Sequence, residues 1–400
     1  MCGIAGFTGM CEDENGVLKS MMDTIAHRGP DSEGEYNENN MVHLGFRRLS
    51  IQDLNHGDQP MFNEDKSMVI TFNGEIYNFK ELREDLIAKG HVFANKADTE
   101  VLIHGYEEYG KELLNKLRGM FAFVIWDDKT KTLFGARDFF GIKPLYYTVV
   151  DGNLVYGSEI KSILKHPYVK KEVNPEALEN YLTFQYSVLP ETFFKGIYKL
   201  MPGHCFTFKD GEMKIEKYWE PKFEPDNTKT MDEAIDEIDN VVANSIEYHK
   251  ISDVEVGSYL SGGVDSSYVV SVAKPDKTFS VGFDESGFDE TKMAKDFSDL
   301  MNVKNYSRYI SKEDFFKTKR DRHYDIVHIH SMWEYMLHQF AALCRHRKWP
   351  YIWSPHGSMT PWAMNYKRWK KLPVWILWQR HDIAKAAMIH VTAPPDRKST

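Results

Sequence analysis

Met1-Cys2-Gly3-Ile4-Ala5-Gly6 opens the chain and places a cysteine directly behind the initiator methionine. Aminopeptidases remove methionine ahead of a small residue, so Cys2 can become the mature N-terminus. Its thiol would then adjoin a free α-amino group, whose pKa of roughly 7.7–8.0 suits proton transfer near neutral pH. One residue would supply both nucleophile and base, as in enzymes with an N-terminal threonine. By itself a cysteine at this position is more often an ordinary residue, so its interpretation as a nucleophile depends on the motifs that follow it.

Composition places the chain among ordinary globular proteins. Its 400 residues suggest two or three domains, and a hydrophobic share of 42% is enough to build packed cores. A formal net charge of −9 argues against a general nucleic-acid binder. The four cysteines show no CxxC spacing, the first residues do not have the basic-then-apolar pattern of a signal peptide, and no apolar run approaches the ~20 residues of a membrane helix. We therefore expect a cytoplasmic protein without nucleic-acid or membrane partners.

Residues 1 to about 205 alternate short apolar stretches with turns and amphipathic stretches. The run Phe121-Ala122-Phe123-Val124-Ile125-Trp126 ends at Asp127-Asp128 and is typical of a buried strand that stops at a turn. Strands are expected at 3–7, 68–73, 120–126 and 131–136, and helices at 18–27, 79–89 and 99–109. Strands with intervening helices predict an α+β domain of layered sheets.

Three polar clusters lie among these elements: Arg48 at a strand start, Asn73-Gly74 at a strand end, and Asp98 in a helix N-cap pattern. Taken singly, each is better explained as a turn, a cap or a surface ion pair. Together they could bind an amino acid. Arg48 would hold its carboxylate and Asp98 its ammonium group, while Asn73 and the Gly74 amide would face a developing oxyanion.

Six motifs follow one another in a fixed order: Met1–Gly6, His27–Asp31, Arg48–Ile51, Asn73–Asn78, Asp98–Glu100 and Arg118–Phe123. Together they resemble the class II glutamine amidotransferases, which use an N-terminal nucleophile. Further stretches narrow the resemblance to the asparagine synthetase B type: Arg137-Asp138, Gly141–Tyr147 and Ser158–Lys161.

The resemblance implies that Cys2 attacks the side-chain amide of glutamine, with Asn73 and Gly74 as the oxyanion hole. Ammonia would be released through a γ-glutamyl thioester, which water then hydrolyses. The positions that match the family's glutamine-binding residues are Arg48, Leu49, Ser50, Ile51, Gln52, Asn73, Gly74, Glu75 and Asp98.

A second region begins behind residues 206–230, a segment expected to be a linker because Glu220–Thr230 is rich in proline and charge. Apolar positions at helical spacing predict a helix over 231–249. Strands are then expected at 253–260, 277–283 and 306–310, with helices at 268–273 and 289–301. This alternation predicts βαβ units and a parallel sheet.

The stretch Ser261-Gly262-Gly263-Val264-Asp265-Ser266-Ser267 joins the first of these strands to its helix. A glycine-rich turn there presents backbone N–H groups and a helix N-terminus to an anion, and Asp265 could hold Mg²⁺. A lone Gly-Gly would be no more than a tight turn, but the full stretch resembles the pyrophosphate loop of ATP-pyrophosphatase enzymes, which include the synthetase half of asparagine synthetases. The resemblance implies ATP as a substrate and these nucleotide-binding positions: Leu260, Ser261, Gly262, Gly263, Asp265, Ser266 and Val281.

From about Lys317 the composition changes, and seven of the nine tryptophans lie after residue 330. The second loop that shapes the aspartate site in the synthetases has no counterpart here. Strands are expected at 325–330, 351–353 and 388–391, with a helix at 332–347. Asp325–His330 followed by Ser354–Met359 resembles part of the N-terminal lobe of a GT-B glycosyltransferase.

The expected architecture therefore has four parts. Residues 1–205 would form an α+β N-terminal-nucleophile amidotransferase domain of layered sheets with helices, and 206–230 a linker. Residues 231–317 would form an α/β parallel-sheet nucleotide-binding segment, a truncated ATP-binding part of an asparagine synthetase. Residues 318–400 would form an α/β glycosyltransferase-like fragment.

Glutamine-dependent synthesis of asparagine from aspartate and ATP, through aspartyl-AMP, is the leading hypothesis. Two alternatives stay open: a stand-alone glutaminase without synthetase activity, and a fused or hybrid glycosyltransferase-like protein. The expected partners are glutamine, aspartate and ATP, and a homodimer is left open. Because the second synthetase loop has no counterpart, we expect these residues to hydrolyse glutamine without making appreciable asparagine.

Overall fold

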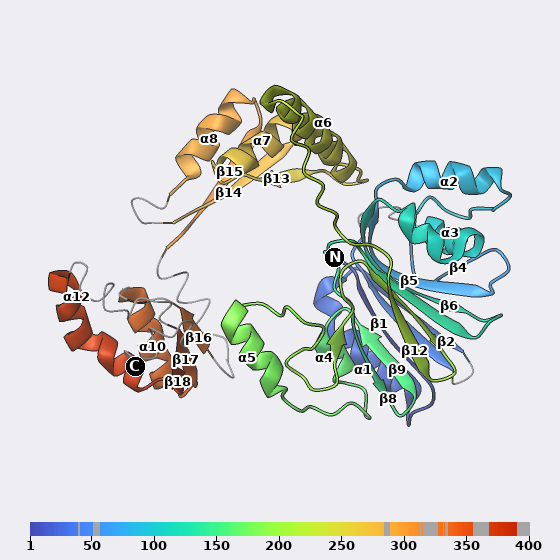
Figure 1. The fold of residues 1–400 in the computed structure, drawn as a ribbon, viewed down its shortest axis with the longest axis horizontal. Coiled ribbons are helices and arrows are strands. Elements are labelled where there is room, and N and C mark those ends of the chain that lie inside the picture. The colour runs from blue at the N-terminus through green and yellow to red at the C-terminus, as the bar shows by residue number, and fades with distance from the viewer. Residues whose placement is uncertain are drawn as a thin grey trace. The chain divides into compact units, whose positions relative to one another are not determined.

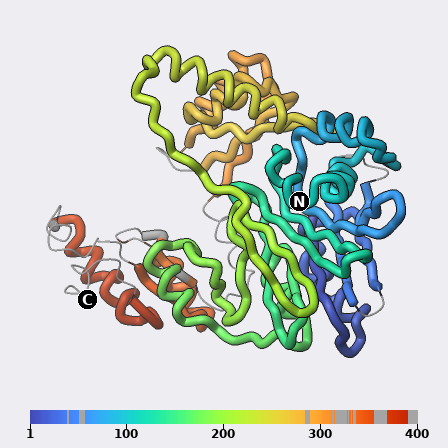
Figure 2. Tube along the Cα trace, turned by 45° about the vertical axis from the view of Figure 1, so that its right-hand side comes forward, coloured from blue at the N-terminus to red at the C-terminus, as the bar shows by residue number. Residues whose placement is uncertain are grey.

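The computed structural model describes residues 1–38, 41–50, 57–283, 289–311, 314, 327–330, 332, 335–354 and 368–389. The chain forms two compact units, one of Met1–Pro175 with Leu189–Tyr309 and one of Glu176–Val188 with Ile310–Thr400. Figure 1 labels the helices and strands, and Figure 2 traces the same chain in a second view. Among the described residues, no helix is both long and apolar enough to cross a membrane.

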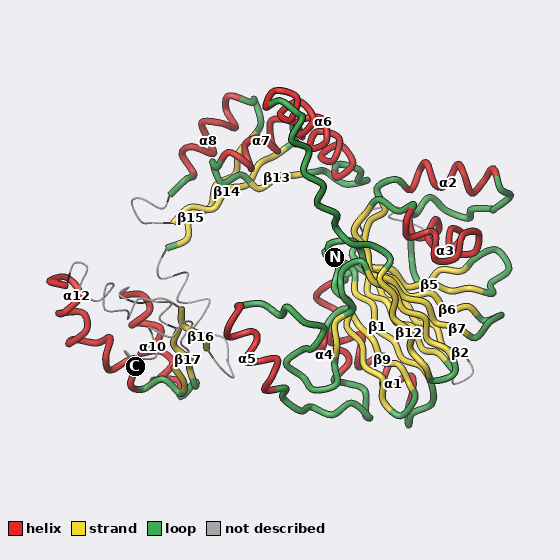
Figure 3. Tube along the Cα trace, in the orientation of Figure 1, coloured by secondary structure: helices red, strands yellow, loops and turns green. Residues whose placement is uncertain are grey.

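Two six-stranded antiparallel sheets form the centre of the amidotransferase-like domain (Figure 3). The first sheet has the order β10-β8-β9-β1-β3-β2. Its strands are β1 Gly3–Thr8, β2 Ser32–Glu38, β3 Val42–Arg48, β8 Tyr146–Val150, β9 Asn153–Gly157 and β10 Tyr198–Lys199. The second sheet has the order β12-β11-β7-β6-β5-β4. Its strands are β4 Met61–Phe62, β5 Met68–Ile76, β6 Gly119–Asp127, β7 Thr132–Arg137, β11 His204–Lys209 and β12 Glu212–Lys217.

The strand β6 shows why these sheets lie in layers. Its alternate side chains enter two different cores: Phe121, Phe123 and Ile125 one core, and Ala122, Val124 and Trp126 the other. Successive side chains of a strand point to opposite faces, so an uninterrupted apolar run requires cover on both sides. The first core is completed by helices, and the second by the facing sheet. The expected α+β layered fold is confirmed.

Helices cover the two outer faces of this pair of sheets. On the second sheet lie α2 (Phe79–Ala88) and α3 (Asp98–Tyr109), whose apolar residues share a core with β5 and β6. On the first sheet lies α1 (Glu14–Thr24), which packs against β1. The other helical segments up to residue 184 are the 3-10 turns η1 Ala26–Arg28 and η2 Gly110–Asn115, and the helices α4 Ile160–Ile163 and α5 Pro175–Phe184.

The boundary expected at residue 205 is wrong. β11 pairs with β7 over four residues from Cys205 to Phe208, and β12 pairs with β11. Cys205 and Phe206 are buried in the two cores of the domain. The second sheet therefore continues to Lys217, and a connection without regular structure begins only behind it.

The segment behind the connection has the expected strand–helix alternation. Its sheet has the order β13-β14-β15, with β13 and β14 parallel. The elements are α6 Met231–His249, β13 Gly257–Tyr259, α7 Val264–Ala273, β14 Lys277–Phe283, α8 Thr291–Leu300 and β15 Lys304–Ile310. A capping box at Thr230 and Glu233 fixes the start of α6. Strand β13 is shorter than the 253–260 expected.

The last part of the chain also has the predicted pattern, in a parallel sheet of order β16-β17-β18. The elements are β16 Val327–His330, α10 Tyr335–Arg347, β17 Tyr351–Ser354, α12 Arg368–Val374, a π-helical turn η3 Trp375–Gln379, α13 Arg380–Ala384 and β18 Met388–Ile389. Asp382 is fully buried there. Its carboxylate lies 2.6 Å from Arg345 Nη1 and 2.8 Å from His338 Nδ1, which ties α13 to α10.

Candidate functional site

Most of the predicted glutamine-site residues meet at one end of the two stacked sheets. Cys2 precedes β1, Arg48 ends β3, Asn73–Glu75 lie near the end of β5, and Asp98 begins α3. They line one pocket together with other residues: Met1, Cys2, Phe46, Arg48, Leu49, Gly57, Gln59, Phe72, Asn73, Gly74, Glu75, Ala97, Asp98, Thr99, Met120 and Lys143.

Some of the predicted residues have other surroundings or lie outside the described chain. Ser50 is not among the residues that line the pocket, and its N–H donates to Asp31 Oδ2 at 2.8 Å. Ile51 and Gln52 lie outside the described residues. The structure therefore brings together most, but not all, of the positions that the motifs singled out.

The thiol of Cys2 is held against the backbone behind β3. Its Sγ accepts from the N–H of Leu49 at 3.4 Å. Burial raises the pKa of the Cys2 thiol, and the hydrogen bond with Leu49 only partly opposes this shift. A thiol with a raised pKa is a poor nucleophile near neutral pH unless a base takes its proton.

The backbone around Cys2 is fixed from both sides. Arg28 Nε donates to the Cys2 carbonyl at 2.9 Å, and Arg28 Nη1 lies 3.2 Å from Glu159. Ser158 accepts from the N–H of Ile4 through its Oγ at 3.0 Å. These contacts give the His27–Asp31 and Ser158–Lys161 motifs a physical role, because they set the position of the N-terminus.

Asn73 is the least satisfied polar side chain of the pocket. It is 1% exposed, and neither its Nδ2 nor its Oδ1 has a hydrogen-bond partner among the described residues. A buried amide without a partner costs free energy, on the order of 1–3 kcal/mol, so such a group in a pocket is typical of a ligand contact. The neighbouring Gly74 has room for no side chain, since a Cβ there would lie 2.2 Å from the Met120 carbonyl oxygen.

Charged groups of both signs surround the pocket. Arg48 is 5% exposed and its Nη1 lies 2.9 Å from Asp58 Oδ1. Burial raises the pKa of Asp98 to about 7, although the N–H of Ile76 donates to its Oδ2 at 2.9 Å. Burial also raises the pKa of Glu75. This arrangement can bind a zwitterion. The carboxylates of Asp98 and Glu75 would face its ammonium group, and the guanidinium of Arg48 would face its carboxylate.

Lys143, Gln59 and Thr99 line the pocket but were not predicted as site residues. Lys143 is 4% exposed, and burial lowers the pKa of its ammonium group. It belongs to the Gly141–Tyr147 motif, so a signal was present, but only as part of a family signature. Gln59 instead contacts the middle of β5, because its Oε1 accepts from the N–H of Phe72 at 2.6 Å.

The predicted nucleotide loop lies between β13 and α7. Gly262 has φ +86°, a conformation that favours glycine, and Gly263 is the N-cap of α7. Ser261 Oγ and Ser266 Oγ lie 3.0 Å apart, and the Ser261 hydroxyl accepts from the N–H of Gly263 at 3.3 Å. Asp265 is exposed in the first turn of the helix. A helix N-terminus with adjacent hydroxyl groups suits a phosphate, and the exposed carboxylate beside it suits a magnesium ion.

The other predicted nucleotide-binding residues flank this loop. Leu260 is buried and its N–H donates to the Phe279 carbonyl at 2.9 Å, which joins β13 to β14. Val281 on β14 is 50% exposed, so its apolar side chain is accessible to the nucleobase of a nucleotide.

Comparison with known proteins agrees with this organisation. The glutamine amidotransferase domain family matches residues 1–219, and the asparagine synthase family matches residues 237–346. The second match continues beyond residue 317, where the resemblance was expected to end.

Several known proteins are similar over most of the chain. Asparagine synthetase [glutamine-hydrolyzing] 1 of Bacillus subtilis is 44% identical over 325 residues, which cover 79% of this chain and 51% of that protein. Asparagine synthetase [glutamine-hydrolyzing] 3 of the same organism is 36% identical, with 72% of this chain and 49% of that protein covered. Amidase chry2 of Gibberella zeae is 34% identical, with 76% and 50% covered.

The chain thus spans about half the length of the curated relatives it matches. The amidotransferase match covers more than half of the chain and includes every described residue of the Cys2 pocket. The chain therefore belongs to the glutamine amidotransferase domain family, and a segment similar to asparagine synthase follows that domain.

Proposed function

We propose that this chain hydrolyses glutamine at Cys2 to supply ammonia for the amidation of aspartate, the reaction named for its asparagine synthetase relatives, and that these 400 residues by themselves couple the two reactions poorly. The observation that carries the proposal is the buried, unpartnered amide of Asn73, which lines the same pocket as the Cys2 thiol. A nucleophile beside an unsatisfied hydrogen-bond donor is the arrangement that an acyl-transfer reaction requires.

The hydrolysis follows from the groups in the pocket. Once Met1 is removed, the freed α-amino group of Cys2 takes the thiol proton, and Sγ attacks the amide carbon of the substrate. Asn73 Nδ2 and the Gly74 N–H stabilise the negative charge that develops on the carbonyl oxygen. Ammonia leaves with the proton returned by the amine, and water then attacks the thioester to release glutamate and restore the thiol.

The surrounding charges support glutamine rather than a simple amide as the substrate. Arg48 would bind the α-carboxylate, and Asp98 with Glu75 would bind the α-ammonium group. Leu49 would contact the substrate through its backbone, while Ser50, Ile51 and Gln52 remain predicted contacts from the resemblance.

The second part of the proposal rests on the loop between β13 and α7. Ser261, Gly262, Gly263 and Ser266 would bind the phosphates of ATP, with Leu260 and Val281 beside the base. Asp265 would hold Mg²⁺, which when bound neutralises charge on the phosphates. The β-carboxylate of aspartate would displace pyrophosphate from ATP, and ammonia would then displace AMP to give asparagine.

Product analysis tests both parts. The chain, shown by mass spectrometry to have lost Met1, is supplied with glutamine alone and then with aspartate, ATP and magnesium. Glutamate and ammonia from glutamine alone support the glutaminase, and hydrolysis by a Cys2→Ala variant would contradict it. Asparagine and AMP formed in step with glutamate support the coupled reaction, whereas glutamate alone would favour the stand-alone glutaminase.

A further inference from the structure

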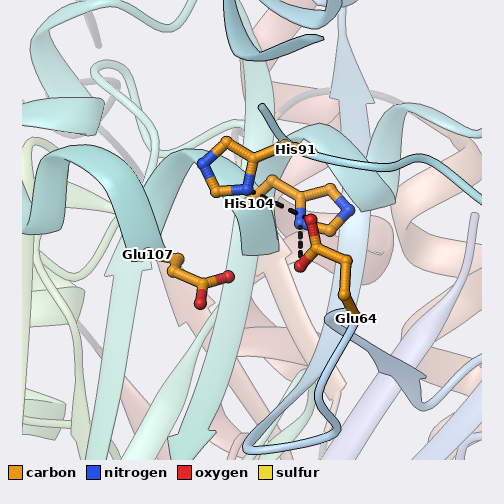
Figure 4. A group of neighbouring side chains, drawn as sticks. All are labelled: Glu64, His91, His104 and Glu107. Atoms are coloured by element: carbon orange, nitrogen blue, oxygen red, sulfur yellow. Dashed lines mark hydrogen bonds and ion pairs between the residues drawn. The ribbon is translucent and has the colours of Figure 1, made fainter. Parts of the chain in front are cut away.

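Four side chains on α3 and beside it point toward one another, outside the Cys2 pocket: Glu64, His91, His104 and Glu107 (Figure 4). Glu64 comes from the turn between β4 and β5, and His91 from the segment between α2 and α3. His104 and Glu107 come from α3, where residues three apart lie on the same face. One nitrogen or oxygen atom of each side chain lies within 4.8 Å of such an atom of every other.

His104 provides an independent sign that something binds here. The side chain is 1% exposed, and neither ring nitrogen has a hydrogen-bond partner in the described part of the chain. Its Nδ1 lies 3.2 Å from Glu64 Oε2, and its Nε2 lies 3.5 Å from Glu100 Oε1, but neither pair is aligned as a hydrogen bond. A buried imidazole normally has a hydrogen-bond partner on at least one ring nitrogen. We therefore infer that a bound group completes the surroundings of His104.

The carboxylate of Glu64 is oriented by its neighbours. Its Oε1 accepts from the N–H of Val92 at 2.9 Å and lies 3.3 Å from His91 Nδ1. Glu107 is also oriented, because its Oε2 accepts from Asn63 Nδ2 at 3.1 Å. Carboxylates and imidazoles that are oriented by such outer contacts are typical of metal ligands.

We propose that Glu64, His91, His104 and Glu107 form a binding site for a divalent transition-metal ion, with Zn²⁺ as the best match. Two imidazoles and two carboxylates supply four ligands of the kinds that zinc takes, whereas calcium and magnesium prefer oxygen ligands alone. Zinc–ligand bonds of ~2.0–2.2 Å in a tetrahedron place neighbouring ligand atoms roughly 3.4 Å apart. The observed 3.2 Å between His104 Nδ1 and Glu64 Oε2 agrees with this spacing, and the widest pairs would close by up to about 1.4 Å.

The metal site would be structural rather than catalytic, because protein side chains would occupy all four coordination positions of the ion and leave none for a substrate. A bound ion would cross-link the β4–β5 turn, the α2–α3 connection and α3 itself. These segments support the glutamine pocket from behind, because β5 carries Asn73 and α3 begins with Asp98. The ion would therefore stabilise the domain without taking part in hydrolysis.

Calorimetry with Zn²⁺ tests the site in the full chain, without an affinity tag and in a Cys2→Ser background that removes the reactive thiol. We expect one equivalent to bind. Glu64→Gln and Glu107→Gln keep the size of the side chain and should each weaken Zn²⁺ binding at least ~10-fold, the smallest effect seen even for residues that only support metal ligands. Glu84→Gln, an exposed glutamate on α2, removes the same charge and should leave binding unchanged.

Two further measurements distinguish this metal site from zinc bound at a cysteine and from a metal-free ion pair. Zn²⁺ should raise the Tm of the parent and of Glu84→Gln, but not that of Glu64→Gln or Glu107→Gln. X-ray absorption should show only nitrogen and oxygen ligands. Equal affinity in all variants, or a zinc–sulfur distance of ~2.3 Å, would overturn the proposal. So would the absence of binding, which would leave His104 paired only with Glu64 and Glu100.

Discussion

Burial determines the acid–base behaviour of single residues in the Cys2 pocket. It raises the pKa of the Cys2 thiol and of the Asp98 carboxyl, and it lowers the pKa of the Lys143 ammonium group. Each shift disfavours the charged form, so each group depends on its neighbours or on a substrate to become charged. Substitutions at this scale should therefore separate chemistry from binding.

Cys2→Ser should reduce glutamine hydrolysis by about 10⁴-fold or more, because the sulfur is the nucleophile in the proposed mechanism. The fold should be unaffected, since the change is small and terminal. Turnover of glutamine to glutamate measures the effect. Cys11→Ser is the matched control and should keep the parental rate, because Cys11 lies in the α1 core away from the pocket. An active Cys2→Ser enzyme would refute the assignment.

Asp98 should make glutamine binding depend on pH. Its carboxyl, with a pKa of about 7, must be ionised to pair with the substrate ammonium group. KM for glutamine should therefore rise about tenfold for each pH unit below 7, and Asp98→Asn should show a high KM at every pH. Steady-state kinetics between pH 5.5 and 8.5 would check this, and a parental pH profile in Asp98→Asn would contradict it.

Asp98 should also make the stability of the fold depend on pH, but here the fold is favoured by low pH, whereas glutamine binding is favoured by high pH. The folded-state pKa of Asp98 lies above its ordinary value of 3.8, so the folded state binds the proton more tightly. Its contribution to the free energy of unfolding is complete below about pH 4 and is lost as the pH rises to about 7. Asp98→Asn, in which this loss is absent, should be relatively more stable than the parent at pH 8 than at pH 4 when both are unfolded with urea.

At the scale of single elements, the close pairing of β5 with β6 limits what position 74 can hold. A Cβ on Gly74 would meet the Met120 carbonyl oxygen at 2.2 Å, so Gly74→Ala must push the two strands apart. We expect a loss of about 1–3 kcal/mol in the free energy of unfolding. Gly152→Ala is the control, because φ there is +75° but no atom lies within 4 Å of the added carbon. A smaller loss at Gly74 than at Gly152 would show that the strands give way easily.

The helices α10 and α13 depend on a buried charge. Asp382→Asn would remove the buried carboxylate that pairs with the partly exposed guanidinium of Arg345, and we expect this to cost about 1–3 kcal/mol. Tryptophan fluorescence in urea suits the measurement, because Trp349 and Trp353 belong to the same core. Asp299→Asn removes an exposed carboxylate on α8 and should leave that transition unchanged. Unchanged unfolding in Asp382→Asn would show that the ion pair contributes little.

At the scale of the whole molecule, glutamine hydrolysis and asparagine synthesis can be measured as separate activities. A polypeptide of these 400 residues should release glutamate from glutamine with little asparagine, because it spans only about half the length of its asparagine synthetase relatives. The ratio of asparagine to glutamate, with aspartate, ATP and magnesium present, measures the coupling. Cys2→Ala with ammonium chloride as the nitrogen source is the control for the synthetase part alone. A ratio near one would show that the tail completes the aspartate site.

The order of local motifs was enough to predict the layered domain, the grouping of residues around Cys2 and the glycine-rich loop between a strand and a helix. These features depend on patterns within short stretches, such as the two-faced apolar run of β6 or the Gly-Gly turn before α7, and local patterns survive in a single sequence. The sequence also indicated Cys2, Asn73 and Asp98 correctly as neighbours, but through a family resemblance rather than through their spacing.

Only the tertiary structure decided how far the second sheet extends and which charged groups share a space. β11 and β12 have ordinary strand composition, and the pairing of β11 with β7 is a long-range contact that no local pattern reports. Lys143 joins the pocket, and Glu64, His91 and His104 meet beside α3, because separate segments fold against the same sheet. Distances and burial between segments far apart in the chain set pKa values and ligand geometry, and these quantities exist only once the chain has packed.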